Sequence, residues 1–220
     1  YDTSMRRFFQ STSHEIKTPL MSIQGFAEGI RDGVFAGQQA DDALETISRE
    51  CQRLKGLLDE MINITRQERP GESRYLEPCD IGDIVQEAVE AMQGYAVEKK
   101  VRVSVDIPDE IQVVGDPEKL RRLFGNLLNN AIRHASSWVC IKGQSAPDSR
   151  SGILISIQDD GKGFSDQDLE HAFDYLYKGA DGSTGLGLSI ARLIVEELNG
   201  TISLRNAENG GGLVEVVFTY

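Results

Sequence analysis

Apolar residues recur at every seventh position near the start of the chain. Phe9, Ile16, Ile23 and Ile30 carry this pattern, and polar or charged residues occupy many of the positions between them. A heptad repeat is typical of a helix that packs one apolar stripe against a neighbouring helix. The pattern therefore predicts a helix over residues 1–32.

A second apolar stripe follows a turn that is rich in glycine. Asp41 and Asp42 suit the positive N-terminus of a helix. Apolar residues then alternate at spacings of three and four: Leu44, Ile47, Cys51, Leu54, Leu58 and Met61. Two such helices form an antiparallel hairpin, and two hairpins can cover all the stripes as a four-helix bundle, so we expect a homodimer through residues 1–69. A hairpin packed on the downstream part of its own chain is the alternative.

The rest of the sequence divides into a linker and a mixed domain. Residues 70–79 contain Pro, Gly and Ser and predict a linker, and residues 80–220 form the domain. Asp80 and Asp116 predict helix starts, and a further helix is expected at 185–198. Short β-rich runs predict strands at 101–107, 111–114, 138–142, 153–158, 201–204 and 213–219. The fold class is α+β, with an all-α antiparallel hairpin followed by an α/β sandwich whose sheet is largely antiparallel.

Composition narrows the class of protein. Of the 220 residues, 40% are hydrophobic and 26% are charged, as in an ordinary soluble globular protein. The formal net charge of -12 argues against a nucleic-acid-binding surface. The 3 cysteines lack the spacing of a metal site or a disulfide framework. No apolar run approaches the length of about 20 residues that a membrane span needs.

One histidine of the first helix has an unusual setting. His14 lies five residues after Phe9 on the face opposite the stripe, with Glu15 beside it and Thr18 one turn further on. Pro19 lacks an N–H group, so the carbonyl of Glu15 loses its helical partner and a bend is expected. A solvated surface residue is the simple interpretation of a lone histidine. With an acid–base neighbour, an exposed imidazole is also a candidate nucleophile.

Amide side chains cluster on the helix that starts at Asp116. Asn126 and Asn130 are one turn apart on one face, and Arg133 follows three residues later. Amide oxygens and a guanidinium on one face suit a polyphosphate with its Mg²⁺ ion. His134 ends the run, and a structural role is its simpler interpretation.

Two glycine-rich runs lie within the polar stretch after the fourth predicted strand. Asp159 can accept a hydrogen bond from an exocyclic amine, while Gly161 and Gly163 let the backbone approach a flat ring. The run from Gly182 to Leu188 leads into a helix, whose N-terminal N–H groups and dipole attract phosphate. Its spacing is that of neither a dinucleotide fingerprint nor a P-loop.

Taken together, these segments resemble the sensor histidine kinases. Residues 8–20 match the phosphoacceptor box Phe-x-x-x-x-Ser-His-Glu-(Leu/Ile)-(Lys/Arg)-Thr-Pro-Leu at every defined position. The later segments resemble, in order, the asparagine, first glycine, aromatic and second glycine boxes of the ATP-binding domain of these kinases. That domain is similar to those of DNA gyrase, heat-shock chaperones and mismatch-repair proteins. The resemblance covers essentially the whole chain and implies binding of ATP and Mg²⁺.

The resemblance also implies a role for each candidate residue. His14 would accept the phosphoryl group, with Glu15 as its base. Asn130 would be the main Mg²⁺ ligand with Asn126 as its helper, and Asp159 would bind the adenine amine. The other nucleotide contacts would come from Arg133, His134, Gly161, Gly163, Tyr177, Lys178, Thr184, Gly185, Leu186, Gly187 and Leu188.

Residues 165–183 would form a lid over the nucleotide. Two residues depart from the family pattern: Leu176 stands where the aromatic box usually has a second Phe, and Ser183 stands where the second glycine box usually has its first Gly. Both departures fall in the lid and bear on its packing, not on the adenine pocket.

The activity implied by the resemblance is an ATP-dependent protein-histidine kinase. It would phosphorylate itself on His14 and pass the phosphoryl group to an Asp of a response regulator. Glu15-x-x-Thr18 resembles bifunctional kinases, so phosphatase activity on that regulator is a second expectation. The resemblance further implies a cytoplasmic catalytic region of a membrane-anchored bacterial receptor, with membrane contact only through an N-terminal region outside this sequence.

Two other functions are considered from the sequence. A gyrase-type ATPase would have a Glu where Asn126 stands, and an amide cannot take a proton from water. A scaffold that merely binds nucleotide would not need His14 and Glu15 side by side. Both alternatives are therefore disfavoured against the kinase.

Overall fold

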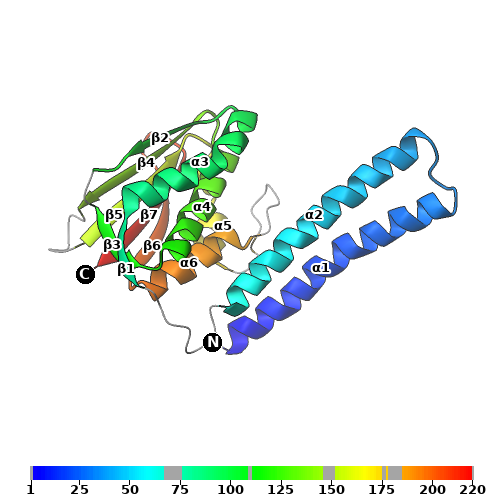
Figure 1. Ribbon diagram of the computed structural model, residues 1–220, viewed down its shortest axis with the longest axis horizontal. Coiled ribbons are helices and arrows are strands. Elements are labelled where there is room, and N and C mark those ends of the chain that lie inside the picture. Colours follow the sequence, from blue (N-terminus) through cyan, green and yellow to red (C-terminus); the bar gives the residue numbers. More distant parts are fainter. Residues whose placement is uncertain are drawn as a thin grey trace. The chain divides into compact units, whose positions relative to one another are not determined.

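The chain divides into two units between Glu72 and Ser73. The computed structural model describes residues 2–66, 76–108, 111–145, 152–174, 177 and 185–219, with the side chains of 2–15, 53, 57 and 59–66 outside this description (Figure 1). None of the helices in the described part of the chain is long and apolar enough to cross a membrane.

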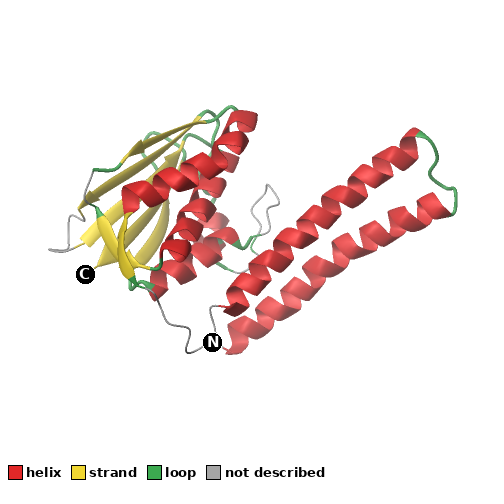
Figure 2. Ribbon diagram, in the orientation of Figure 1, coloured by secondary structure: helices red, strands yellow, loops and turns green. Residues whose placement is uncertain are grey.

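The first unit is a helical hairpin. Helix α1 (Asp2–Arg31) and helix α2 (Gln38–Arg66) lie alongside each other and are joined by a short turn (Figures 1 and 2). Both helices were predicted, although α2 begins at Gln38 and not at Asp41. Helix α1 is uninterrupted at Pro19, whose side chain is buried.

Glycine and an aromatic pair shape the turn of the hairpin. Gly33 and Gly37 have φ angles of 72° and 57°, which residues with a Cβ rarely adopt. Phe35 folds back over Gly29, where a Cβ would overlap its ring, and its centroid lies 5.8 Å from that of Phe26. The turn therefore has a small apolar cluster of its own.

The hairpin covers only part of its apolar surface. On α2, Ile47 and Leu54 are partly buried, whereas Leu44, Cys51 and Leu58 are exposed. The predicted single stripe is thus two stripes, because residues three apart are offset by about 60° around a helix. One neighbouring helix covers one of them, and the other remains at the surface.

The second unit is a layer of helices on a sheet. Its first half comprises β1 (Glu77–Asp80), α3 (Ile81–Lys99), β2 (Arg102–Asp106), β3 (Gln112–Gly115), α4 (Pro117–His134) and β4 (Trp138–Ser145). Its second half comprises β5 (Gly152–Asp159), α5 (Asp166–His171), α6 (Gly187–Glu197), β6 (Thr201–Asn206) and β7 (Gly212–Thr219). Helix α4 lies between α3 and α6, and these helices cover one face of the sheet (Figure 2).

The main sheet has the strand order β2-β4-β5-β7-β6. Its pairs are antiparallel except β2–β4, which is parallel. The predicted strand at 111–114 does not join this sheet, because β3 pairs with β1 in a separate two-stranded sheet. Residues 77–79, which the sequence assigned to the linker, are therefore part of β1.

Alternate side chains of β5 face the core, and the last of them is a carboxylate. Ile153, Ile155 and Ile157 are buried against the helices, and Leu120, Leu123 and Leu127 are among the α4 side chains that are fully buried. Asp159 continues the alternation of β5, so its carboxylate also points to the buried face and is only 6% exposed.

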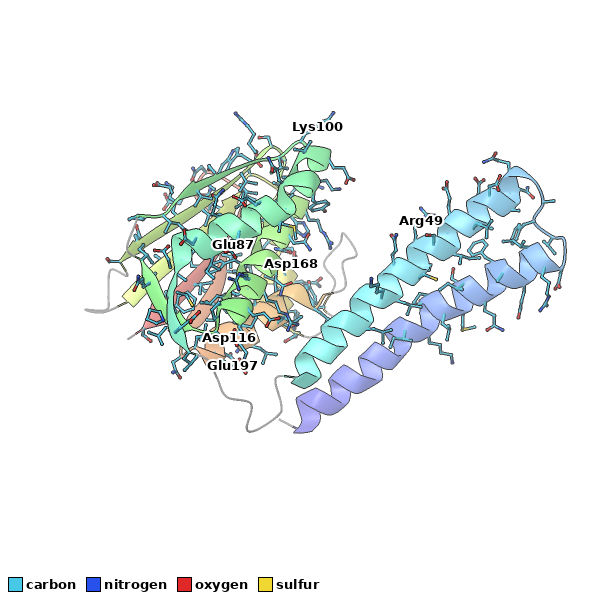
Figure 3. All side chains as sticks on the ribbon, viewed as in Figure 1. Arg49, Glu87, Lys100, Asp116, Asp168 and Glu197 are labelled. Atoms are coloured by element: carbon cyan, nitrogen blue, oxygen red, sulfur yellow. The ribbon has the colours of Figure 1, made fainter. Side chains whose placement is uncertain are left out.

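Helix α4 is fixed at its start and on both flanks. The carboxylate of Asp116 accepts hydrogen bonds from the backbone N–H groups of 118 and 119, as the sequence predicted. Arg121 pairs with Glu87 of α3, and Lys119 pairs with Glu197 of α6 at 2.6 Å (Figure 3). The helix that carries the asparagines is therefore held between its neighbours.

Candidate functional site

Asn126 and Asn130 are both partly buried on α4. The Nδ2 atom of Asn126 is buried and has no hydrogen-bond partner among the described residues. A Cβ on Gly187 would lie 3.9 Å from Oδ1 of Asn126, so this amide lies beside the N-terminus of α6. An unsatisfied buried amide is costly and suits a site that a polar ligand completes.

The N-terminus of α6 is where the sequence predicts a phosphate-binding element. Gly185 has a φ of 71°, and Leu186 is fully buried and forms no side-chain cap to the helix. Gly187 and Leu188 begin the helix and are partly buried. The dipole of an 11-residue helix therefore points at the region beside Asn126.

Asp159 is held so that its two oxygens differ. Its Oδ1 accepts hydrogen bonds from the backbone N–H of Gly161 at 2.8 Å and of Gly212 at 3.2 Å. Neither bond uses Oδ2. A buried carboxylate with one oxygen satisfied by the protein can present the other to a hydrogen-bond donor of a ligand.

The glycines after Asp159 allow a close approach of backbone segments. A Cβ on Gly161 would overlap the carbonyl oxygen of His134, at the end of α4, and Gly163 has a φ of 75°. The loop after β5 is therefore packed directly on the end of α4. Arg133 is partly buried in that last turn, and the His134 side chain is exposed.

Asp160, to which the sequence gave no role, fixes the same region. Its Oδ1 accepts from the backbone N–H groups of Ser136, Ser137 and Trp138 at 2.9, 2.8 and 3.0 Å, and its Oδ2 accepts from the Ser137 hydroxyl at 2.5 Å. Desolvation alone raises the pKa of Asp160, but these hydrogen bonds outweigh it and lower the pKa to about 2. The carboxylate thus clamps the turn between α4 and β4 to the loop after β5.

A polar cluster follows around α5. The Ser165 hydroxyl caps the helix and also donates to Asp168 Oδ2 at 2.6 Å, while the Tyr177 hydroxyl donates to Asp168 Oδ1 at 3.0 Å (Figure 3). The bond from Ser165 is the main cause of the lowered pKa of Asp168. Desolvation, followed by the bond to Asp168, raises the pKa of Tyr177. Tyr177 is thereby tied to α5.

The structure brings some candidate residues together and leaves others outside its description. Asn126 lies at Gly187, and Asp159 lies at Gly161, which packs on His134. Lys178, Thr184, Leu176 and Ser183 lie outside the described residues, as do the side chains of His14 and Glu15 on α1. Thr18 is described and is exposed on α1. Within the described part, no group of three or more His, Cys, Asp or Glu side chains could hold a metal ion.

Comparison with protein families identifies both units. Residues 115–220 match the family described as histidine kinase-, DNA gyrase B-, and HSP90-like ATPase, and residues 4–70 match the His Kinase A (phospho-acceptor) domain. The second unit is thus an ATP-binding domain, and the hairpin is a phosphoacceptor domain.

Relatives with both domains point to one family. The sensor protein SphS of Synechococcus elongatus is 32% identical over 219 residues, covering 94% of this chain and 52% of SphS. The sensor histidine kinase CssS of Bacillus subtilis is 28% identical over 210 residues, covering 95% of this chain and 46% of CssS. The chain belongs to the sensor histidine kinases, and it spans about half the length of these curated relatives.

A solved structure supports the same fold. The Acinetobacter baumannii histidine kinase AdeS superposes with a TM-score of 0.74 at 22% identity, covering 94% of this chain and 97% of the AdeS chain. The resemblance to sensor histidine kinases that the sequence motifs indicated is therefore confirmed. The predicted fold class, a helical hairpin followed by an α/β ATP-binding domain, is confirmed as well.

Proposed function

We propose that this chain transfers the γ-phosphoryl group of ATP to His14. The observation that carries the proposal is the buried carboxylate of Asp159, which among the described residues is bonded through Oδ1 and not Oδ2. The same unit aims a helix N-terminus at an asparagine amide that has no partner among those residues. An adenine amine and a polyphosphate chain are the two ends of one ligand that these features suit.

Adenine would be bound at the loop after β5. Oδ2 of Asp159 would accept a hydrogen bond from the exocyclic amine, while Gly161 and Gly163 keep side chains away from the ring. The phosphates would lie toward α6, where the backbone of Gly185 and Gly187 and the cationic side chains of Arg133 and Lys178 offset their charge. Tyr177, Thr184, Leu186, Leu188 and His134 would complete the contacts around the nucleotide.

Asn130 and Asn126 would hold Mg²⁺ through their amide oxygens. Oxygen ligands of this kind suit a hard divalent cation that keeps several waters and binds phosphate oxygens. When bound, the ion would supply positive charge to the triphosphate, and the buried Nδ2 of Asn126 would remain available to donate to a phosphate oxygen. The partly buried positions of both asparagines, one turn apart on α4, support this assignment.

The acceptor step would take place on α1. A ring nitrogen of neutral His14 forms a bond to the γ-phosphorus as the bond from that phosphorus to the β–γ bridging oxygen breaks and ADP leaves. Glu15 accepts the proton from the other ring nitrogen. The rate gain would come from positioning and charge neutralisation, as is general for phosphoryl transfer.

A kinase fits the site better than an ATPase. The residue four positions before Asn130 is Asn126, and an amide cannot act as the base that activates water. The site would therefore protect ATP from hydrolysis until an acceptor other than water is presented.

A homodimer through residues 1–69 is supported by the surface of the hairpin. Leu20, Met21, Leu44 and Leu58 are 54%, 61%, 54% and 48% exposed, although all are large apolar side chains. A second hairpin would cover them in a four-helix bundle.

Further steps follow from the family. The phosphoryl group would pass from His14 to an Asp of a cognate response regulator, and Thr18, exposed one turn after His14, could orient water for dephosphorylation of that regulator. The chain would be the cytoplasmic catalytic region of a membrane-anchored receptor, with no role in nucleic-acid binding.

Labelling with γ-labelled ATP and Mg²⁺ tests the proposal. The wild-type chain should gain a label that is stable in base and lost in acid, as expected for a phosphoramidate. His14→Gln should gain none while binding ATP with unchanged affinity. A label that persists in His14→Gln, or that survives acid, would contradict the assignment of His14.

A further inference from the structure

The hairpin between β6 and β7 ends at the nucleotide loop. Asn206 and Gly212 are paired across its last rung. The turn between them closes with hydrogen bonds from Ala207 N–H to Gly211 O at 3.0 Å and from Gly210 N–H to Ala207 O at 2.9 Å. Gly210 and Gly211 have φ angles of 88° and 87°, so the tight turn depends on glycine.

Asn206 is hydrogen-bonded to Phe164, at the end of the loop that follows β5. Its Oδ1 accepts from the backbone N–H of Phe164 at 2.6 Å, and its Nδ2 donates to the Phe164 carbonyl at 2.9 Å. Both bonds are made to one residue, so they fix its position and its orientation. A Cβ on Gly163 would lie 2.5 Å from the Asn206 Oδ1, so the glycine there makes room for this contact.

Gly212 is hydrogen-bonded to Asp159, at the start of the same loop. Its backbone N–H donates to Asp159 Oδ1 at 3.2 Å. A Cβ on Gly212 would lie 2.8 Å from Asp159 Oδ2 and 2.9 Å from Phe164 Cε2. The paired residues Asn206 and Gly212 therefore hold Phe164 and Asp159, the two ends of one loop.

We infer that Asn206 is a positioning residue for adenine recognition, acting through the Phe164 backbone on the loop that ends at Asp159. This inference rests on the proposed binding of adenine at Asp159 Oδ2. The hairpin engages Oδ1 through Gly212, and Asn206 keeps the loop in the register in which that engagement is possible. Loss of the two hydrogen bonds to Phe164 lets the loop and the Asp159 carboxylate shift relative to the adenine amine.

The expected effect is specific to the base. The bonds of Asn206 lie at the surface, so water can satisfy Phe164 when they are lost and the unit remains folded. The phosphate-binding groups at α6 belong to another element and do not depend on Asn206. Affinity for the adenine amine therefore falls, while affinity for the triphosphate is retained.

The experiment compares the binding of two nucleotides to variants of the 220-residue chain. ATP and inosine triphosphate differ at the position of the exocyclic amine, where the inosine base has a carbonyl oxygen. Calorimetric titration of Asn206→Ala should show the Kd for ATP raised about tenfold and the Kd for inosine triphosphate changed by less than about twofold, as loss of two modest hydrogen bonds predicts. Asn209→Ala is the matched control, because Asn209 is exposed in the same turn.

Asn206→Asp is the second variant, and it keeps an acceptor for the Phe164 N–H but cannot donate to the Phe164 carbonyl. It should lower the preference for ATP by at least about threefold, and it decides the question if Asn206→Ala does not fold. An unchanged preference for ATP over inosine triphosphate, with or without equal weakening of both, overturns the inference. A wild-type chain with no preference for ATP overturns instead the proposed role of Asp159.

Discussion

The two units of the chain differ in how completely they bury their apolar side chains. In the ATP-binding unit, Leu120, Phe124 and Ile155 are among many core residues with almost no exposed surface. In the phosphoacceptor hairpin, Pro19 and Ala43 are the only buried side chains among those that the structure describes. The ATP-binding unit has a closed core, whereas the hairpin leaves large apolar side chains such as Leu44 at its surface.

Polar contacts show the same difference. Hydrogen bonds of Asp159 and Asn206 join segments that are 53 and 42 residues apart in sequence. The side-chain bonds described on the hairpin, such as Gln24–Glu28, Arg49–Thr46 and Arg31–Asp32, link residues that are one to four apart in sequence. The nucleotide unit is thus preorganised by contacts within its own chain, and under the proposed function the exposed apolar side chains of the hairpin are covered by a partner.

The largest expected effect concerns that partner. The double variant Leu44→Glu/Leu58→Glu should be monomeric, because four half-exposed leucines leave the interface of a dimer and each contributes about 1 kcal/mol on burial. The dimer Kd should rise by a factor on the order of 1,000. Sedimentation velocity measures the change.

Val97→Glu is the control for this variant, since Val97 is 70% exposed but lies in the nucleotide unit. It should remain dimeric. If the double leucine variant sediments as the wild type does, the hairpin is not the interface and the comparison between the units is broken.

The next prediction tests whether nucleotide binding can be lost without a change in oligomeric state. Asp159→Asn keeps an acceptor for the N–H groups of Gly161 and Gly212. It replaces the other, charged oxygen with an NH₂ group, which is a donor and cannot accept a hydrogen bond from the adenine amine. The Kd for ATP should rise about 100-fold, and the sedimentation coefficient should not change. Titration calorimetry gives the affinity, and equal binding by the variant and the wild type would show that Asp159 does not contact adenine.

A smaller loss is expected from crowding the same carboxylate. Gly212→Ala places a methyl group 2.8 Å from Asp159 Oδ2, so the carboxylate must move and the Kd for ATP should rise about tenfold. Gly94→Ala is the matched control, because Gly94 is exposed and a Cβ there meets no atom within 4 Å. If both substitutions leave binding intact, the fit between the β6–β7 hairpin and Asp159 is looser than described.

The last effect concerns stability, not binding, and it depends on pH. The pKa of Asp160 is about 2 in the folded chain against a reference value of 3.8, so its hydrogen bonds stabilise the fold above pH 4 and this contribution is lost as the pH falls toward 2. Asp160→Asn should lower the free energy of unfolding at pH 7 by about 1–2 kcal/mol, with a difference that shrinks in acid.

Trp138 reports this transition, because it is the single tryptophan and its backbone N–H donates to Asp160. Urea unfolding followed by its fluorescence at pH 7, 4 and 2.5 measures the difference between variant and wild type. Asp106→Asn, an exposed carboxylate on β2, is the control. A difference that stays constant with pH would mean that the ionised form of Asp160 is not what the clamp requires.

Much of the local structure could be predicted from the sequence. A heptad repeat predicted α1, and apolar spacings of three and four predicted α2. Asp80 and Asp116 predicted the starts of α3 and α4, because periodicity and caps act over a few residues. Strand β1 was missed, since its four residues Glu77–Asp80 gain their order from pairing with β3. The split of the α2 stripe was also missed, because spacing alone does not say which apolar residues a given neighbour covers.

The candidate site was predicted in part. Resemblance grouped Asn126, Asp159 and Gly187, and the structure brings Asn126 to the start of α6. The hydrogen bonds of Asp160, Asn206 and Gly212 were not predicted, because each joins segments that are distant in sequence. The second Asp after β5 and the Gly210-Gly211-Gly212 run were the available signals, and both are ambiguous without knowledge of what packs against them.

The central claim is that the nucleotide unit delivers phosphate to His14 and not to water. Protein-bound phosphoryl and free phosphate, measured together over time from γ-labelled ATP, test it most directly. The account predicts that bound phosphoryl rises to a plateau of at most one group per chain, with little free phosphate, and that His14→Gln abolishes the bound fraction. Steady release of free phosphate over many turnovers, undiminished in His14→Gln, would contradict it.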